Sequence, residues 1–231
     1  MSVNSIIGHR FLVNEERYYD KAWVELVDFM PHPASGVTGD MAIVNAARTS
    51  FLGESKGLDK DKKLLFYLYK NKHTSPFEMV QFKFRIRVPL VTWWQILRHR
   101  TLSANLQSGR YTPFEENDFY IPTEKDWRKQ SESNKQGSSD ETFTLSEQID
   151  VISDLIDVGI NDIKPETSSF SELFDLWSRN SYTIYERLLL SGAAKEQARL
   201  FLPAFALYYQ GVISVDSHNL MHFLRLRMNE H

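Results

Sequence analysis

The segment Gln81–Val88, QFKFRIRV, constrains the fold more than any other part of this chain of 231 residues, because its polar and apolar residues alternate without a break. Successive side chains of a β-strand point to opposite faces, so this pattern predicts one buried face and one charged face. The apolar face would consist of Phe82, Phe84, Ile86 and Val88. Pro89 ends the strand, and the apolar run Val91–Leu97 that follows predicts a helix.

The rest of the chain predicts many helices and few other strands. Strands are expected at Trp23–Met30 and Tyr208–Val215, with a short strand-like segment at Asp118–Pro122. Helices are expected at Asp40–Arg48 with Asp40 as the N-cap, Leu58–Lys70 with Leu65, Leu68 and Tyr69 on one face, Leu145–Ile160, Phe170–Leu190, Ala194–Leu202 and His218–Met228. Strands and helices do not alternate regularly, which predicts an α+β fold with an antiparallel or mixed sheet and several flanking helices.

The length is sufficient for one good core or two small ones, and we expect a single domain, residues 1–231. Residues 125–144 are polar and contain few apolar residues, so we expect a mobile surface insertion there and not a domain linker.

Composition excludes several classes of protein. The chain has no cysteine, which excludes disulfides, thiolate zinc sites and a cysteine nucleophile within these residues. The formal net charge of −3 argues against a nucleic-acid coat protein, which usually carries a basic excess. No apolar stretch is long enough to cross a bilayer, and the first ten residues lack the apolar core of a signal peptide. We therefore expect a soluble, cytoplasmic protein without a membrane partner.

The run Arg98–Tyr111, RHRTLSANLQSGRY, contains three arginines and a histidine directly after the predicted helix. A guanidinium group bonds two phosphate oxygens at once, and Ser108, Gly109 and Arg110 add a hydroxyl, a closely approachable backbone and another guanidinium. The run thus predicts a pocket for an anionic, planar ligand such as a nucleotide. The alternative is that the basic residues only stabilise the helix C-terminus, where serine, asparagine and glycine are common.

The spacing of RHR, seven residues, then Ser108 and Arg110, resembles the signature of the flavin-dependent thymidylate synthases. Two further segments agree with this resemblance, the turn HTSPFE at His73–Glu78 and the helix EQARLFLP at Glu196–Pro203. By themselves these segments would be an ordinary turn and a helix whose arginine pairs with a carboxylate. The resemblance begins near Trp23. The family usually continues into another helix at the point reached by His231, so either further residues or a shorter fold is implied.

The resemblance implies an enzyme, a flavin-dependent methyltransferase that converts dUMP to dTMP. Methylenetetrahydrofolate would donate the carbon, FAD the hydride, and NADPH would reduce the flavin. The unrelated class of thymidylate synthase adds a cysteine thiolate to the uracil ring, which a chain without cysteine cannot do. The family also implies a homotetramer whose sites are shared between subunits, with no metal and no nucleic acid.

The resemblance also assigns roles to particular residues. Arg227 would be catalytic, because the matching arginine faces the uracil ring and helps to ionise it. Arg225 lies two positions earlier on the same predicted helix and would therefore point to a different face. The dUMP-binding set would be Gln95, Arg98, Leu106, Gln107, Ser108, Gly109, Arg110, Arg199 and Arg227. The FAD-binding set would be Ser75, Arg98, His99, Arg100, Leu106, Asp216, Ser217, His218 and His222.

Three positions depart from the family pattern. Leu106 stands where glutamate is frequent, so it would contribute only backbone or packing contacts. The family often has asparagine at the position of Asp216. It often has an arginine or a similar hydrogen-bond donor near the position of His218. Ser108 has no base beside it in the sequence, which favours a hydrogen-bonding role over a nucleophilic one.

Two rival hypotheses remain open. A single-stranded nucleic-acid-binding module could use Arg98, Arg100 and Arg110 with neighbouring aromatic side chains as a stacking surface. It would be colourless and would bind with strong salt dependence. The other rival is a catalytically inactive interaction protein that has kept the fold.

Overall fold

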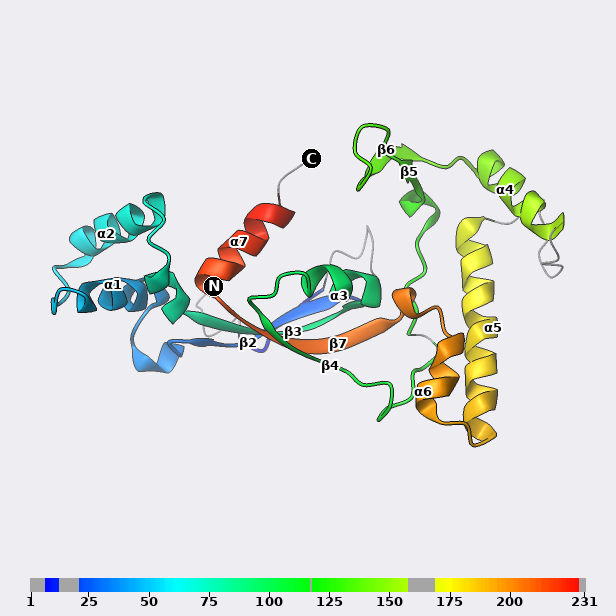
Figure 1. Cartoon of the computed structure of the whole chain (residues 1–231), viewed down its shortest axis with the longest axis horizontal. Coiled ribbons are helices and arrows are strands. Elements are labelled where there is room, and N and C mark those ends of the chain that lie inside the picture. Colours follow the sequence, from blue (N-terminus) through cyan, green and yellow to red (C-terminus); the bar gives the residue numbers. More distant parts are fainter. Residues whose placement is uncertain (1–6, 13–20, 117, 158–168, 229–231) are drawn as a thin grey trace.

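The computed structural model describes residues 7–12, 21–116, 118–157 and 169–228. Its centre is a five-stranded sheet in the order β1–β2–β3–β7–β4, in which all neighbouring strands are antiparallel (Figure 1). The strands are β1 (Arg10–Leu12), β2 (Trp23–Met30), β3 (Gln81–Pro89), β4 (Ser103–Leu106) and β7 (Tyr208–Asp216). The expected α+β fold with an antiparallel sheet in one domain is confirmed.

The alternation in β3 has the predicted consequence at Ile86 and Val88, whereas Phe82 and Phe84 of the same face are only partly buried. Ile86 and Val88 are buried, at 7% and 6% exposure, and pack in the core beneath the sheet. On the opposite face, Arg85 pairs with Glu25 of β2 at 3.3 Å, and Arg87 pairs with Asp118. The charged face is therefore covered by ion pairs, which lets β3 occupy the middle of the sheet.

Helix α3 (Leu90–Ile96) follows Pro89 and lies over the middle of the sheet (Figure 1). Its bounds fall one residue before those of the predicted stretch Val91–Leu97. Its Trp93 is fully buried, and the indole Nε1 donates a hydrogen bond to the carbonyl oxygen of Tyr209 at 2.8 Å. The ring rests on Gly211 of β7, where a Cβ atom would lie 2.8 Å from the indole and 3.1 Å from the carbonyl oxygen of Asn105. A glycine is thus required where α3 crosses the sheet.

We expect Gly211→Ala to lower the free energy of unfolding by about 1–3 kcal/mol, because neither the buried indole nor the β4 backbone can give way easily. Urea denaturation would measure the loss. Gly39→Ala is the matched control, since the added Cβ would meet Val80 at an ordinary 3.7 Å. Equal stability of the two variants would contradict the proposed packing constraint.

Helices α1 (Gly39–Thr49) and α2 (Leu58–Lys70) lie together at one end of the sheet (Figure 1). The predicted cap of α1 is wrong. Thr38 is the N-cap, and its Oγ1 accepts from the Met41 amide at 3.2 Å, while Asp40 lies in the first turn, where a carboxylate favours the helix dipole. The bounds of α2 are confirmed, but only Leu68 of its predicted apolar face is fully buried and Tyr69 is 60% exposed.

The other end of the sheet carries α5 (Phe170–Leu190), with the predicted bounds, and α6 (Lys195–Ala198) beside it (Figure 1). The predicted helix Ala194–Leu202 is shorter than expected, because a 3-10 turn at Arg199–Phe201 follows α6. Between Asp118 and Pro122 the structure forms a single bridge, Phe119 to Leu207, and no full strand.

The polar segment 125–144 contains a hairpin that composition did not predict. It consists of β5 (Arg128–Gln130) and β6 (Ser138–Thr142). The flanking rings of Trp127 and Phe143 lie 5.5 and 5.4 Å from the ring of Phe170 at the start of α5. Two aromatic side chains thus tie the hairpin to the domain, while its mobility stays a prediction.

Helix α4 (Leu145–Asp157) follows the hairpin, and the predicted end at Ile160 lies outside the described residues. Across the described ranges, no helix combines the length and apolarity needed to span a bilayer.

Candidate active site

Helix α7 (Ser217–Arg227) begins at the end of β7 and is fixed there by two residues of the predicted FAD set. Asp216 is its N-cap, and the carboxylate accepts from the backbone amide of Asn219 at 2.8 Å and from its side chain at 2.6 Å. The hydroxyl of Ser217 donates to the carbonyl oxygen of Phe77 at 2.5 Å. Both residues are 9% exposed, so they hold α7 firmly against the turn that contains HTSPFE.

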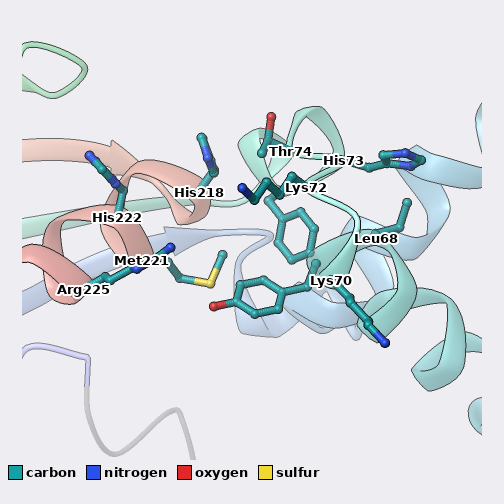
Figure 2. Close-up of a pocket in the computed structure, with 11 residues that line it drawn as sticks. Leu68, Lys70, Lys72, His73, Thr74, His218, Met221, His222 and Arg225 are labelled. Atoms are coloured by element: carbon teal, nitrogen blue, oxygen red, sulfur yellow. The ribbon is translucent and has the colours of Figure 1, made fainter.

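A cavity of about 450 Å³ lies between this turn, the end of α2 and α7 (Figure 2). His218 and His222 approach it from α7, and Lys72 and Thr74 approach it from the turn. Leu68, Phe77 and Met221 give it an apolar floor. Six lining residues carry basic side chains and none of the described lining residues is acidic. The basic set is Lys70, Lys72, His73, His218, His222 and Arg225.

The structure therefore brings two residues of the predicted FAD set, His218 and His222, to the cavity wall. Ser75 is exposed and starts the 3-10 turn Ser75–Met79, next in the chain to Thr74 of the wall. Three further wall residues were not predicted from the sequence, because they resemble the solvent face of a helix and an ordinary loop: Lys70, Lys72 and His73. The basic run KNKH immediately before TSPFE was the available signal.

His99, the centre of RHR, packs beneath α7. Its ring meets Phe223 edge-on at 4.8 Å, and its Nε2 is buried without a hydrogen-bond partner among the described residues. Burial lowers the pKa of His99, and the positive charges of Arg227 and His222 lower it further. These effects favour the neutral form of the imidazole, while Arg98 and Arg100 on either side of it are exposed.

The two arginines of α7 diverge as their spacing predicted. Arg225 lines the cavity, whereas Nη1 of Arg227 lies 3.5 Å from Oε1 of Gln95 at the end of α3. That separation makes a weak hydrogen bond, and the contact is exposed. The guanidinium of Arg227 keeps most of its donors available for a ligand.

Most of the remaining predicted dUMP residues form a second group at the end of β4 and in the turn that follows it. Leu106 pairs with Gly211, and the amide of Gln107 donates to the carbonyl oxygen of Gln210 at 2.8 Å. The hydroxyl of Ser108 accepts from the amide of Arg110 at 3.3 Å. These contacts shape a tight turn that presents Arg110 outward.

Packing explains the glycine of this turn. Gly109 is buried, and a Cβ atom there would lie 2.5 Å from the ring of Phe114. That ring is 2% exposed and is held in the core beside Tyr185. Burial raises the pKa of Tyr209, and the positive charge of Arg199 lowers it. Arg199 is therefore near enough to Tyr209 to belong to the same region.

The two groups lie at different ends of β7 within one chain. Arg110 pairs with Glu196 of α6, which precedes β7, whereas α7 follows β7. Nine residues of extended strand span roughly 30 Å. Figure 1 accordingly shows α6 beside α5 and α7 on the other side of α3. Arg110 and Arg199 are thus separated along the sheet from the basic cavity.

These features show the class of protein: an α+β protein whose clustered basic side chains suit an anionic ligand. Across the described residues, no group of three or more His, Asp or Glu side chains is placed to hold a metal ion. The family model described as "Thymidylate synthase complementing protein" matches residues 25–231. The chain belongs to this family, Thy1.

Curated relatives agree with the family match. A protein of Dictyostelium discoideum named flavin-dependent thymidylate synthase is 38% identical over 226 residues, covering 97% of this chain and 66% of its own length. A protein of the same name from Thermus thermophilus is 38% identical over 209 residues, covering 90% of this chain and 65% of its own. The chain therefore spans about two thirds of the length of these relatives.

Among solved structures, the chain is similar to the UMP/dUMP methylase PolB from Streptomyces cacaoi bound with 5-Br dUMP. The TM-score is 0.64 at 29% sequence identity, and the match covers 90% of this chain and 78% of that one. None of these three proteins is named as a nucleic-acid-binding module, so the similarities give that alternative no support.

Proposed function

We propose that this protein is a flavin-dependent thymidylate synthase that methylates dUMP at C5 to form dTMP. The observation that carries the proposal is the cavity lined by six basic residues between α7 and the HTSPFE turn, in a chain of the Thy1 family. FAD would be the cofactor, with NADPH and methylenetetrahydrofolate as co-substrates. The enzyme would act in the cytoplasm.

The basic cavity suits FAD by its donor chemistry. N–H groups of lysine, histidine and arginine side chains favour phosphate oxygens, and the apolar floor favours an aromatic body. Lys72, His218, His222 and Arg225 would hold the cofactor there, with Ser75, Arg98, His99 and Arg100 at its border. The flavin supplies the hydride chemistry when bound. The lowered pKa of His99 disfavours a further positive charge beside Arg227.

The nucleotide would be held by both groups of predicted residues. Arg110 and Arg199 would bind the phosphate, with Ser108 and the backbone of Leu106–Gly109 beside it, and Gln95 and Arg98 would lie nearer the base. C5 of uracil is a poor nucleophile, so negative charge that develops on the ring must be stabilised. Arg227 would do this, because a guanidinium aimed at the ring donates hydrogen bonds to the atoms on which that charge develops. A chain without cysteine has no thiolate to activate the ring instead.

Because Arg110 and α7 lie apart within one chain, we propose that each site combines residues of neighbouring subunits in a homotetramer. Exposed apolar side chains on α7 and α5 provide surfaces for such an assembly. Leu226 is 49% exposed, Trp177 is 53% exposed and Leu190 is 75% exposed.

The purified protein should be yellow and should release a stoichiometric amount of flavin on denaturation. FAD binding to the flavin-free protein, followed by fluorescence, should weaken in Lys72→Ala and Arg225→Ala, because each variant removes a basic side chain from the cavity wall. Arg179→Ala is the matched control, since Arg179 pairs with Asp175 on α5 outside the cavity. A colourless protein that does not take up added FAD would exclude the proposed function and favour the nucleic-acid or interaction alternatives.

A further inference from the structure

Arg110, to which the proposed function assigns the nucleotide phosphate, already has an acidic partner in this chain. Its Nε lies 3.2 Å from Oε2 of Glu196 on α6. The two side chains are 66% and 53% exposed. An ion pair so open to water contributes little to stability, so it can open at little cost.

The position of Arg110 does not depend on this ion pair. The neighbouring residue Tyr111 is held independently, because its carbonyl oxygen accepts from Nζ of Lys195 at 2.9 Å. On the other side, Gly109 is packed against the buried ring of Phe114. Glu196 is therefore not needed to hold the turn in place, and its carboxylate has another consequence for the site.

That consequence is competition for the guanidinium. Positions 196 and 199 lie three residues apart along a helical stretch, so Glu196 and Arg199 point to the same side. A phosphate held between Arg110 and Arg199 would lie close to the Glu196 carboxylate and would be repelled by it. Anion binding at Arg110 must therefore displace Glu196.

We propose that Glu196 is a specificity-determining residue, whose carboxylate occupies Arg110 until the phosphate of the nucleotide displaces it. A monoanion that replaces a carboxylate gains little, because the charges are equal. A phosphate monoester carries nearly two negative charges at neutral pH and gains more from the same guanidinium. The replacement of Glu196 by the ligand therefore favours phosphorylated ligands over chloride and free carboxylates. This inference rests on the role that the proposed function gives to Arg110.

The test compares wild type with Glu196→Gln by calorimetric titration of dUMP and of deoxyuridine, which lacks the phosphate. The variant should bind dUMP about two- to fivefold more tightly, as expected for loss of one exposed competing pair, and should bind deoxyuridine as wild type does. Added chloride should weaken dUMP binding more in the variant than in wild type, because monoanions then gain access to Arg110.

Asp175→Asn is the matched control, because it removes a carboxylate paired with Arg179 at 2.9 Å and changes the net charge equally. Unchanged or weaker dUMP binding in Glu196→Gln would overturn the inference, as would an equal gain in the control or in deoxyuridine binding. If wild type binds neither nucleoside nor nucleotide, the proposed function fails. In that case inorganic phosphate is titrated into wild type and into Glu196→Gln. Tighter phosphate binding in the variant would support the role of Glu196, and unchanged or weaker binding would overturn it.

Discussion

Replacement of Arg227 by alanine is expected to lower turnover by about a hundredfold or more while weakening dUMP binding far less. The reason is that the charge it would stabilise grows along the reaction and is small in the bound substrate. A weak contact with Gln95 at 3.5 Å leaves the guanidinium available for that task. Steady-state kinetics with saturating folate and NADPH, together with titration of dUMP, would separate kcat from binding.

Arg225→Ala is the matched control for this experiment, because it removes an arginine two positions away that lines the cavity instead. It should weaken FAD binding and should recover much of its turnover at high FAD concentration. Unchanged turnover in Arg227→Ala, or a larger loss in Arg225→Ala, would show that ring activation had been assigned to the wrong side chain.

Mixing two inactive proteins, Arg110→Ala and Arg227→Ala, should restore about a quarter of the wild-type activity if subunits exchange freely and each site takes these arginines from different chains. Under random exchange, that fraction of sites receives an intact Arg110 from one chain and an intact Arg227 from another. The separation of α6 from α7 within one chain motivates the experiment. Activity would be measured after confirmed exchange, with the assembly size determined alongside.

A mixture of Gln95→Ala with Arg227→Ala supplies the control. These two side chains are in contact within one chain, so one chain supplies both of them to a site. Each chain in this mixture lacks one of the two, so no site can contain both. That mixture should stay at the level of its parents. Restoration in the control, or none in the test mixture, would contradict the shared arrangement while leaving the flavin chemistry open.

Local patterns were sufficient for most of the secondary structure. The alternation of β3 and the bounds of β2, α2 and α5 follow from side-chain periodicity and from residues that end an element, such as Pro89 and Gly192 with its φ of 85°. The errors occurred where two residues offer similar chemistry or where few residues are involved. Thr38 and Asp40 can both cap a helix, and only the backbone geometry selects Thr38.

The candidate site divides in the same way. The RHR run and the HTSPFE turn were recognisable from their residues and spacing, and the family match agrees with the resemblance they carry. The basic cavity was not recognisable, because Lys72 and Arg225 are far apart in sequence and meet only where α7 packs on the turn through Ser217.

The sequence by itself determined most of the elements, the family and the identity of the basic residues, because these depend on neighbours within a few positions. The tertiary structure decided their grouping. It packed His99 beneath α7 and so lowered its pKa, it paired Arg110 with Glu196, and it set the Arg110 turn apart from α7. The physical reason is that pKa, ion pairing and ligand access depend on distances and burial that arise only when strands such as β4 and β7 come together.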